Sequence, residues 1–597
     1  MIKNLTLLLF STLLIFSCKK QTKENVKPDA TASFQTVLKN YYEEGLLLNP
    51  VQATMTGDNR FNDQFPNTLS ETYIDSLKNY YLKYKKEIAQ FNDTHLSVTE
   101  QMSKAVLAWE CAINTEYLSF NNYKFFPIDQ MWSVNLFFGQ LASGQSAQPF
   151  KTVDDYNNWL KRVDGFVVWL TTAEARMKEG MAANYVLPKS LIVKVIPQLE
   201  AMTNPDIEQH LFYTPIKSLP ENFSTEDKAV LTKAFTEMVT EKIIPTYQSL
   251  LNFMKTDYLK AGRTTSGIAE TPNGKSYYEH QIKKYTTTSM SSEEIHELGL
   301  SEVARILSEM EKVKKQVGYE GNLKSFFNYV RNKKELMPFT DAQQIIDNFN
   351  AIHERMKPQL EKLFDKTPKT AFEVRQTEAF RENSASAEYN PGSIDGTRPG
   401  IFYTPIPNAS KYNIYSDESL FLHEAIPGHH YQISLTQENE ELSNFRKVLW
   451  YSGYGEGWAL YTESLGKELG LYTDPYQYFG MLGAEMHRAI RLVVDTGLHA
   501  KGWTREQAIQ YSLDNEAESE AGIIAEIERY MANPGQALSY KIGQLKIREL
   551  RGKAEQELGD TFDIREFHNQ ILETGCIPLS LLETKINNWI NASKPVQ

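Results

Sequence analysis

The densest cluster of chemically capable side chains lies between Phe421 and His430, where three of the chain's eleven histidines fall within eight residues. His423 is followed directly by Glu424, and His429 and His430 come just after a Pro-Gly pair. On a helix, two histidines four residues apart can hold zinc while a neighbouring glutamate reaches the bound water. The residue types therefore indicate a zinc site that activates water for hydrolysis.

The spacing of these histidines departs from that pattern, because the position four after His423 is Pro427. On an uninterrupted helix His429 would point to the wrong face, and His430 would lie about 10.5 Å further along the axis. Pro427 lacks a backbone donor and its ring crowds the carbonyl of His423, while Gly428 permits unusual dihedrals. We expect a helical bulge that absorbs two residues and makes His429 the second ligand, with His430 as the alternative.

The histidine segment and three further blocks, at residues 396–403, 456–463 and 491–499, resemble the bacterial domain-of-unknown-function 885 family. The resemblance extends over most of the chain. It implies likeness to zinc peptidases of the thimet oligopeptidase, carboxypeptidase Taq and dipeptidyl peptidase III kind. In the first two types a glycine directly precedes the second ligand, so the resemblance favours His429.

The block at residues 454–459 is similar to the Asn-Glu-Gly-Phe-Ala segment of many zinc aminopeptidases, which implies that Glu456 is the third ligand. The 27 positions after His429 leave room for the chain to return antiparallel and bring this carboxylate to the metal. Two imidazoles and one carboxylate suit one zinc ion with an open position for water, on which Glu424 would act as general base. Glu463 lies on the same helical face as Glu456 and either orients a ligand histidine or is a surface acid.

Further site residues rest on weaker patterns. Related peptidases place a histidine or tyrosine against the developing oxyanion, which suggests His499 and Tyr540 as catalytic donors, with helix packing as the alternative for Tyr540. Residues 401–404 are expected to form an edge strand that binds an extended peptide, so Arg398, Phe402 and Tyr403 are the predicted substrate-binding residues. The alternative is a structural hairpin that covers the site.

Two more arginines, Arg488 and Arg491, lie at helical spacing. They could clamp a peptide carboxylate or pair with Glu485 or Asp495 on their own helix.

The surrounding sequence is predominantly helical. Apolar residues recur at helical spacing from residue 33 onward, and helix starts carry capping residues followed by acids, as at residues 225–227 and 291–294. Residues 385–407 break the pattern with three glycine-containing turns and predict a small hairpin. We expect a mainly α, two-lobed metallopeptidase-like fold, with a small sheet or hairpin beside the active-site helix and a single domain over residues 33–597.

The first 18 residues resemble a bacterial lipoprotein signal: Lys3 precedes an apolar stretch that leads into Ser17 and Cys18. Cys18 would become the acylated N-terminus, followed by a polar tether over residues 19–32; a plain secretory signal is the alternative. The mature chain would keep Cys111 and Cys576, too few for a disulfide framework. A lipid anchor implies the bacterial envelope, and we expect the outer membrane, facing the periplasm.

Composition narrows the function further. The 597 residues carry a net charge of −12, which argues against nucleic acid as a partner.

The combined prediction is a zinc-dependent peptidase that hydrolyses short peptides in the envelope. The alternative is a non-enzymatic lipoprotein that binds peptide or glycan and holds a structural metal. The sequence leaves the natural substrate, the cleavage position and the oligomeric state open.

Overall fold

The computed structural model describes residues 30–378, 382, 386–394, 396 and 398–594. The predicted signal segment, the lipid-attachment residue Cys18 and most of the tether lie outside these residues. The last part of the expected tether does not: helix α1 (Ala30–Leu48) begins at Ala30 and includes residues 30–32.

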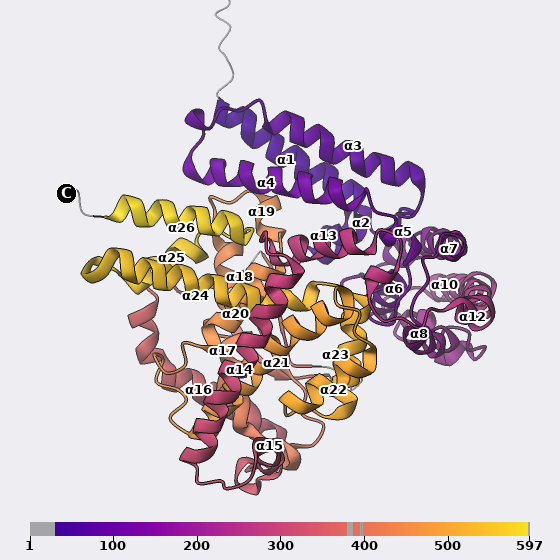
Figure 1. Cartoon of the computed structure of the whole chain (residues 1–597). Helices are drawn as coiled ribbons and strands as arrows, with labels where there is room; N and C mark the ends of the chain where they lie inside the picture. The colour runs from indigo at the N-terminus through magenta and orange to yellow at the C-terminus, as the bar shows by residue number, and fades with distance from the viewer. Residues whose placement is uncertain (1–29, 379–381, 383–385, 395, 397, 595–597) are drawn as a thin grey trace, which may run out of the picture.

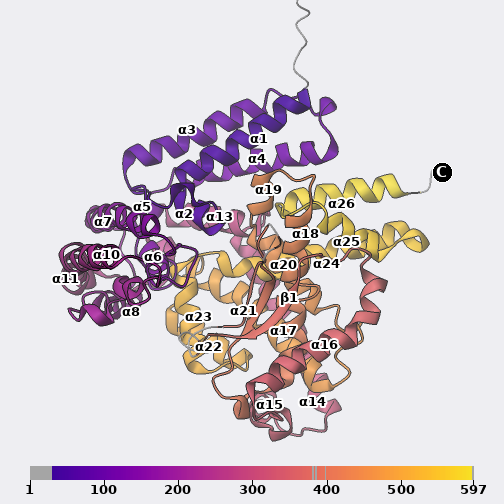
Figure 2. The same ribbon diagram turned by 180° about the vertical axis from the view of Figure 1, so that it is seen from behind.

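Helices α1, α3 and α4 form a layer at one end of the molecule (Figures 1 and 2). The helix predicted around Phe34 and Leu38 is confirmed as α1, and both side chains are buried. Ser97 and Glu100 form a reciprocal capping box that starts α4. The other two helices of this layer are α3 (Glu71–Ile88) and α4 (Val98–Tyr117), and the short helix α2 (Pro50–Met55) lies between the layer and the neighbouring helices.

A second group of helices forms a lobe beside the main body, at the right of Figure 1. It has its own hydrophobic core, in which the rings of Phe138, Trp159 and Phe166 stack face to face. This core lies apart from the larger core, as expected for a two-lobed fold. The lobe comprises α5 (Asn122–Phe125), α6 (Val134–Ala142), α7 (Val153–Ala182), α8 (Lys189–Ala201), α9 (Thr214–Lys217), α10 (Thr225–Glu237), α11 (Ile244–Phe253) and α12 (Leu259–Ala261).

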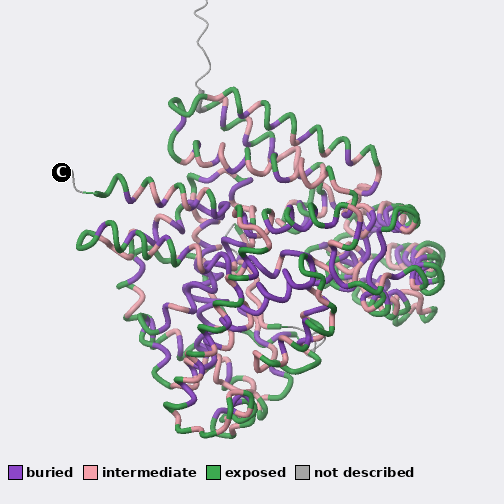
Figure 3. The backbone as a smooth tube through the Cα atoms, viewed as in Figure 1, coloured by how far each residue is buried: buried purple, intermediate pink, exposed green. Residues whose placement is uncertain are grey.

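The larger core is built mainly from residues of the second half of the chain, and most of the buried residues of the main body lie there (Figure 3). The predicted capping at Ser291 and Glu294 is confirmed as the start of α14. The helices here are α13 (Gly274–Thr286), α14 (Ser292–Gln316), α15 (Leu323–Asn332), α16 (Ala342–Leu363), α17 (Asp417–Glu424), α18 (His429–Glu438), α19 (Asn444–Val448), α20 (Ser452–Glu463), α21 (Pro475–His499), α22 (Arg505–Asn515), α23 (Glu520–Ala532), α24 (Ser539–Leu558), α25 (Ile564–Leu572) and α26 (Leu579–Ser593).

The sheet has three strands, β1 (Phe372–Gln376), β2 (Glu388–Asn390) and β3 (Gly400–Thr404), in the order β1-β3-β2. Strands β2 and β3 pair antiparallel, which confirms the predicted hairpin. Strand β1 pairs parallel with β3 and was not predicted. Strand β3 is therefore the centre of the sheet, and the prediction that residues 401–404 form an edge was wrong.

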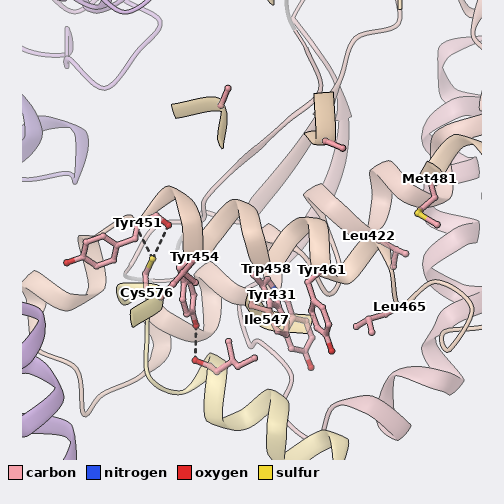
Figure 4. Close-up of a cluster of buried hydrophobic side chains, with 14 of the residues drawn as sticks. Leu422, Tyr431, Tyr451, Tyr454, Trp458, Tyr461, Leu465, Met481, Ile547 and Cys576 are labelled. Atoms are coloured by element: carbon pink, nitrogen blue, oxygen red, sulfur yellow. Dashed lines mark hydrogen bonds between the residues drawn. The ribbon is translucent and has the colours of Figure 1, made fainter. Parts of the chain in front are cut away.

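Helix α20 is anchored by aromatic side chains on one of its faces (Figure 4). The Tyr454 hydroxyl donates to the Ile571 carbonyl at 2.8 Å, and the indole of Trp458 donates to the Pro427 carbonyl at 2.8 Å. Cys576 accepts from the backbone N–H of Tyr451 at 3.2 Å and is a free thiol, as expected. These contacts hold α20 against both the C-terminal helices and the segment between α17 and α18.

Candidate metal centre

The histidine segment forms two helices with a sharp break between them. Helix α17 ends at Glu424, the peptide bond between Ile426 and Pro427 is cis, and α18 begins at His429. Gly428 lies so close to the end of α17 that a Cβ there would be 2.0 Å from the carbonyl oxygen of His423. The expected bulge within one continuous helix was therefore wrong: the chain turns over this close glycine contact and starts a new helix.

The break brings three potential ligand atoms together. His423 Nε2 lies 3.6 Å and His429 Nε2 3.4 Å from the same Glu456 carboxylate oxygen. The candidate ligand atoms of the three residues all lie within 4.8 Å of one another, and the two imidazole planes are 88° apart. Two neutral nitrogens and one hard oxygen at this spacing can hold one divalent metal ion with a position left open.

Glu463 orients one of these histidines. Its Oε1 lies 2.7 Å from His423 Nδ1, and its other oxygen accepts from the Ser419 hydroxyl at 2.6 Å. A hydrogen bond to Nδ1 leaves Nε2 as the lone-pair nitrogen directed at the metal position. Of the two alternatives for Glu463, the structure supports the orienting role, because the side chain is buried and not a surface acid.

The charges of the centre are strongly coupled. Burial alone would lower the pKa of His423, but hydrogen bonds to Glu456 and Glu463 outweigh it and raise the pKa to about 9. Burial would raise the pKa of Glu456, but the two imidazoles hold it well below its usual range. A divalent cation between these atoms would replace the proton that the histidine otherwise holds, so metal binding here releases protons.

His430 points away from the three ligands. Its Nδ1 lies 3.0 Å from the hydroxyl of Tyr389, and its ring packs 4.9 Å from that of Phe372. Burial lowers its pKa to about 4. Of the two histidines that the sequence left open, His429 is therefore the one that lies with His423 and Glu456.

The three candidate ligands line a cavity of about 810 Å³, and Glu424 lines the same cavity. Burial raises the pKa of the Glu424 carboxyl, against the opposing charge of the two ligand histidines. Strand β2 borders one side of the cavity and helices α21 and α23 border the other. Among the strands formed by the described residues, β2 pairs only with β3 and is an outer strand of the sheet, where an extended chain could be added.

The three predicted substrate-binding residues do not meet in this cavity. Phe402 is completely buried in the core against Phe349, with the ring centroids 5.0 Å apart, because it lies on the inward face of the central strand. Its predicted substrate contact is therefore wrong. Tyr403 lies on the other face of β3, and Arg398 is exposed in the turn before that strand.

The two predicted oxyanion donors have different environments. His499 is completely buried; its Nδ1 accepts from the backbone N–H of Ile268 at 3.0 Å and its Nε2 lies 2.9 Å from the Tyr530 carbonyl oxygen. No ring nitrogen is left for a substrate, so the role expected of His499 does not fit the structure. Tyr540 does line the cavity with the ligands and stacks beneath the guanidinium of Arg491 at 4.6 Å.

Arg491 does not pair with either acid of its own helix. It binds Glu526 at 2.9 Å and the Tyr530 hydroxyl at 2.9 Å, both from α23. Glu485 pairs with Lys541 at 2.7 Å. The alternative of pairing within one helix therefore does not hold for Arg491, because a neighbouring helix supplies its partner.

Sequence reasoning missed Trp450, which lines the cavity 5.7 Å from the ring of His429 and is 44% exposed. Gly455 makes room for it, since a Cβ there would lie 2.1 Å from the indole. The glycine directly before Glu456 was a signal of such close packing. Arg529 and His487, which also line the cavity, had no comparable signal in the sequence.

Several solved structures are similar to this chain. The chain is similar to a protein of Colwellia psychrerythraea described as a "putative lipoprotein", with 28% identity, a TM-score of 0.85, and coverage of 94% of this chain and 100% of that one. It is also similar to a "putative lipoprotein of unknown function" from Shewanella oneidensis, at 18% identity and a TM-score of 0.74, covering 92% and 99%. Pz peptidase A gives a TM-score of 0.28 at 12% identity, covering 87% and 97%.

No curated protein matches the chain. Within the part of the chain that the structure describes, no helix has both the length and the apolar character needed to cross a bilayer.

Residues 50–586 match the sequence model of DUF885, a family of bacterial proteins of unknown function. That span covers nearly the whole chain and includes every residue of the candidate metal centre, so the protein belongs to the DUF885 family.

Proposed function

We propose that the protein is a zinc-dependent peptidase that hydrolyses short peptides. The observation that carries this proposal is the cluster of His423, His429 and Glu456 in one cavity with the buried carboxylate of Glu424. A purely structural metal site has no need of a general base beside it. The ligand set of two imidazoles and one carboxylate is that of hydrolytic zinc sites, which keep one position open.

Each side chain then has a defined task. Zinc, when bound, polarises the scissile carbonyl and promotes the ionisation of water. The Glu424 carboxylate takes a proton from the attacking water and passes it to the nitrogen of the leaving amine. The Tyr540 hydroxyl donates a hydrogen bond to the oxygen that becomes negatively charged.

Strand β2 supplies the alignment. An extended peptide placed along its outer edge would exchange backbone hydrogen bonds with residues 388–390, which leaves side-chain preference to the cavity walls. This replaces β3 as the strand proposed to bind the substrate. The exposed ring of Trp450 beside His429 offers an apolar surface for one substrate side chain.

We place the enzyme in the bacterial envelope, attached through an acylated Cys18. The Ser17-Cys18 pair after an apolar stretch supports this, as does the description of both similar structures as lipoproteins. Metabolic labelling with a fatty acid, compared between the parent and Cys18→Ala, tests it. Label that remains in the variant would rule out Cys18 as the attachment point.

The catalytic proposal is tested by zinc content and peptide hydrolysis measured together. The parent should bind about one zinc per chain, and Glu424→Gln should keep the metal but lose roughly 100-fold or more in kcat. Glu518→Gln is the matched control, since Glu518 lines the same cavity but is exposed and contacts no ligand. A folded parent that takes up no zinc would favour the non-enzymatic binding lipoprotein, and full activity in Glu424→Gln would remove Glu424 from the mechanism.

A further inference from the structure

We propose that the cavity recognises the free α-carboxylate of its peptide through Arg488, so that the enzyme cleaves near the carboxyl end of its substrates. This inference rests on the proposed peptidase function and adds the substrate class. It follows from the way positive charge is distributed on the cavity wall opposite β2.

The other cations of this wall each have a carboxylate partner. Arg491 and Arg529 share Glu526, at 2.9 and 3.1 Å. His487 Nδ1 lies 2.6 Å from a carboxylate oxygen of Glu516, the residue that follows α22. The shared carboxylate offsets only part of the charge of the two arginines, but it holds both guanidinium groups in place.

Arg488 differs from these neighbours. Its one hydrogen bond to another described residue runs from Nη1 to the carbonyl oxygen of Ala484, at 3.3 Å, one turn earlier on α21. No described carboxylate forms an ion pair with it, whereas Arg491 and Arg529 both contact Glu526. Its charge acts on the Glu424 carboxyl, whose pKa it lowers, without a direct contact. Holding a partly buried guanidinium without a directly bonded counter-ion is costly, and a carboxylate entering the cavity would offset that cost through charge-assisted hydrogen bonds.

The position of Arg488 also explains which carboxylate would reach it. The side chain lines the metal cavity and, together with His423 and His487, a smaller adjoining recess of about 240 Å³. The recess continues along α21 past Ala484 and Gly483, and a Cβ on Gly483 would meet nothing within 4 Å. A terminal residue can therefore place its side chain in the recess and its carboxylate on Arg488, while the chain runs back along β2 over the metal centre.

The reaction is a simple hydrolysis. The peptide C–N bond breaks, a C–O bond forms with oxygen from water, and the proton taken up by Glu424 goes to the amine of the released C-terminal fragment. Arg488 is a binding residue in this scheme and takes no part in proton transfer.

The test uses the zinc-loaded protein and one peptide in two forms, with a C-terminal carboxylate or a C-terminal amide. The parent should hydrolyse the acid with a kcat/KM roughly 10- to 100-fold above that of the amide, as expected for one charge-assisted pair. Arg488→Gln should remove this preference by slowing the acid much more than the amide, because the influence of its charge on Glu424 is common to both substrates. Arg529→Gln is the matched control from the same cavity and should keep the preference, because Arg529 is paired with Glu526.

Equal hydrolysis of acid and amide by the parent, or an equal loss for both in Arg488→Gln, would overturn the inference. If the zinc-loaded parent hydrolyses neither form, the peptidase proposal fails, and binding of the two labelled peptides by fluorescence anisotropy decides this inference separately. Acid-selective binding that Arg488→Gln abolishes would support it. Binding without selectivity, or no binding, would refute it.

A second variant tests the recess. Gly483→Leu should fill it without a clash and with a gain in helix propensity, so the fold should be retained. We expect kcat/KM to fall for peptides that end in Phe and to change little for those that end in Ala. A uniform effect on both peptides would show that the terminal side chain does not enter the recess.

Discussion

Helices α20 and α24 approach so closely that the single substitution Gly543→Ala should weaken both the fold and the metal centre. A Cβ at this position would lie 1.9 Å from the Gly453 carbonyl oxygen and 2.6 Å from the Cα of Gly457. These are backbone atoms that cannot rotate away, so the helices must part by about 1.5 Å to reach ordinary contact at 3.4 Å. Glu456, which directly precedes Gly457, would move with α20.

The expected cost can be bounded from opposing effects. Overpacking a well-filled core costs typically ~1 to 3 kcal/mol, and a clash with rigid backbone belongs at the upper end. Replacing glycine by alanine within a helix raises the free energy of unfolding by roughly 0.5 to 1 kcal/mol. We therefore expect Gly543→Ala to lose ~2 kcal/mol of unfolding free energy, together with part of its zinc affinity.

Gly552→Ala is the matched control on the same helix. Gly552 is exposed and a Cβ there meets nothing within 4 Å, so this variant should gain about 0.5 to 1 kcal/mol from helix propensity alone. Urea unfolding of the parent and both variants, with zinc titrated against a chelating dye, measures the two effects. If Gly543→Ala proved as stable as Gly552→Ala and bound zinc like the parent, the close helix contact would not be what positions Glu456.

Three further predictions concern individual side chains. Glu463→Ala removes the hydrogen bond to His423 Nδ1 and should weaken zinc binding roughly 10- to 100-fold in the same dye titration; unchanged affinity would contradict the orienting role. Burial raises the pKa of Asp495 to about 7, so the folded state binds more protons than the unfolded state between about pH 4 and 7, and stability is lost as the pH rises through that range. Urea midpoints at pH 5 and pH 8 should differ less in Asp495→Asn than in the parent, and an equal difference in both would assign the effect to another group. Tyr540→Phe should lower kcat for peptide hydrolysis by roughly 100-fold with little change in KM, and a change in KM alone would make Tyr540 a binding residue.

Local patterns in the sequence predicted a mainly helical chain, the positions of a few helices and part of the sheet. The capped start at Ser291 and the apolar spacing around Phe34 both correspond to helices, because a cap and an amphipathic stripe act over one or two turns. The turn-rich residues 385–407 contain the β2–β3 hairpin for the same reason. Strand β1 carried no such signal, since its parallel pairing with β3 joins segments that are far apart in the sequence.

The geometry of the site depended more heavily on tertiary contacts. Phe402 was predicted to face substrate, but whether a strand lies at an edge or in the centre is decided by its partners on both sides. His499 was chosen by analogy, and its role was excluded by two backbone groups from distant segments, at Ile268 and Tyr530. A side chain's type can be read from the sequence, but its neighbours cannot.

The sequence by itself indicated the kind of ligand set, two histidines and one glutamate, from the His-Glu pair, the later histidines and the Glu-Gly-Trp block, but it left His429 and His430 as alternatives. It did not determine how those residues meet. The break at Gly428, which turns His429 inward and His430 toward Tyr389, depends on the packing of α17 against α20 and on the hydrogen bond from Trp458 to the Pro427 carbonyl. That Arg488 has no ion-pair partner among the described residues likewise became visible only in the folded structure. The pairing of charges in a cavity depends on segments, here α21 and α23, that only folding brings together.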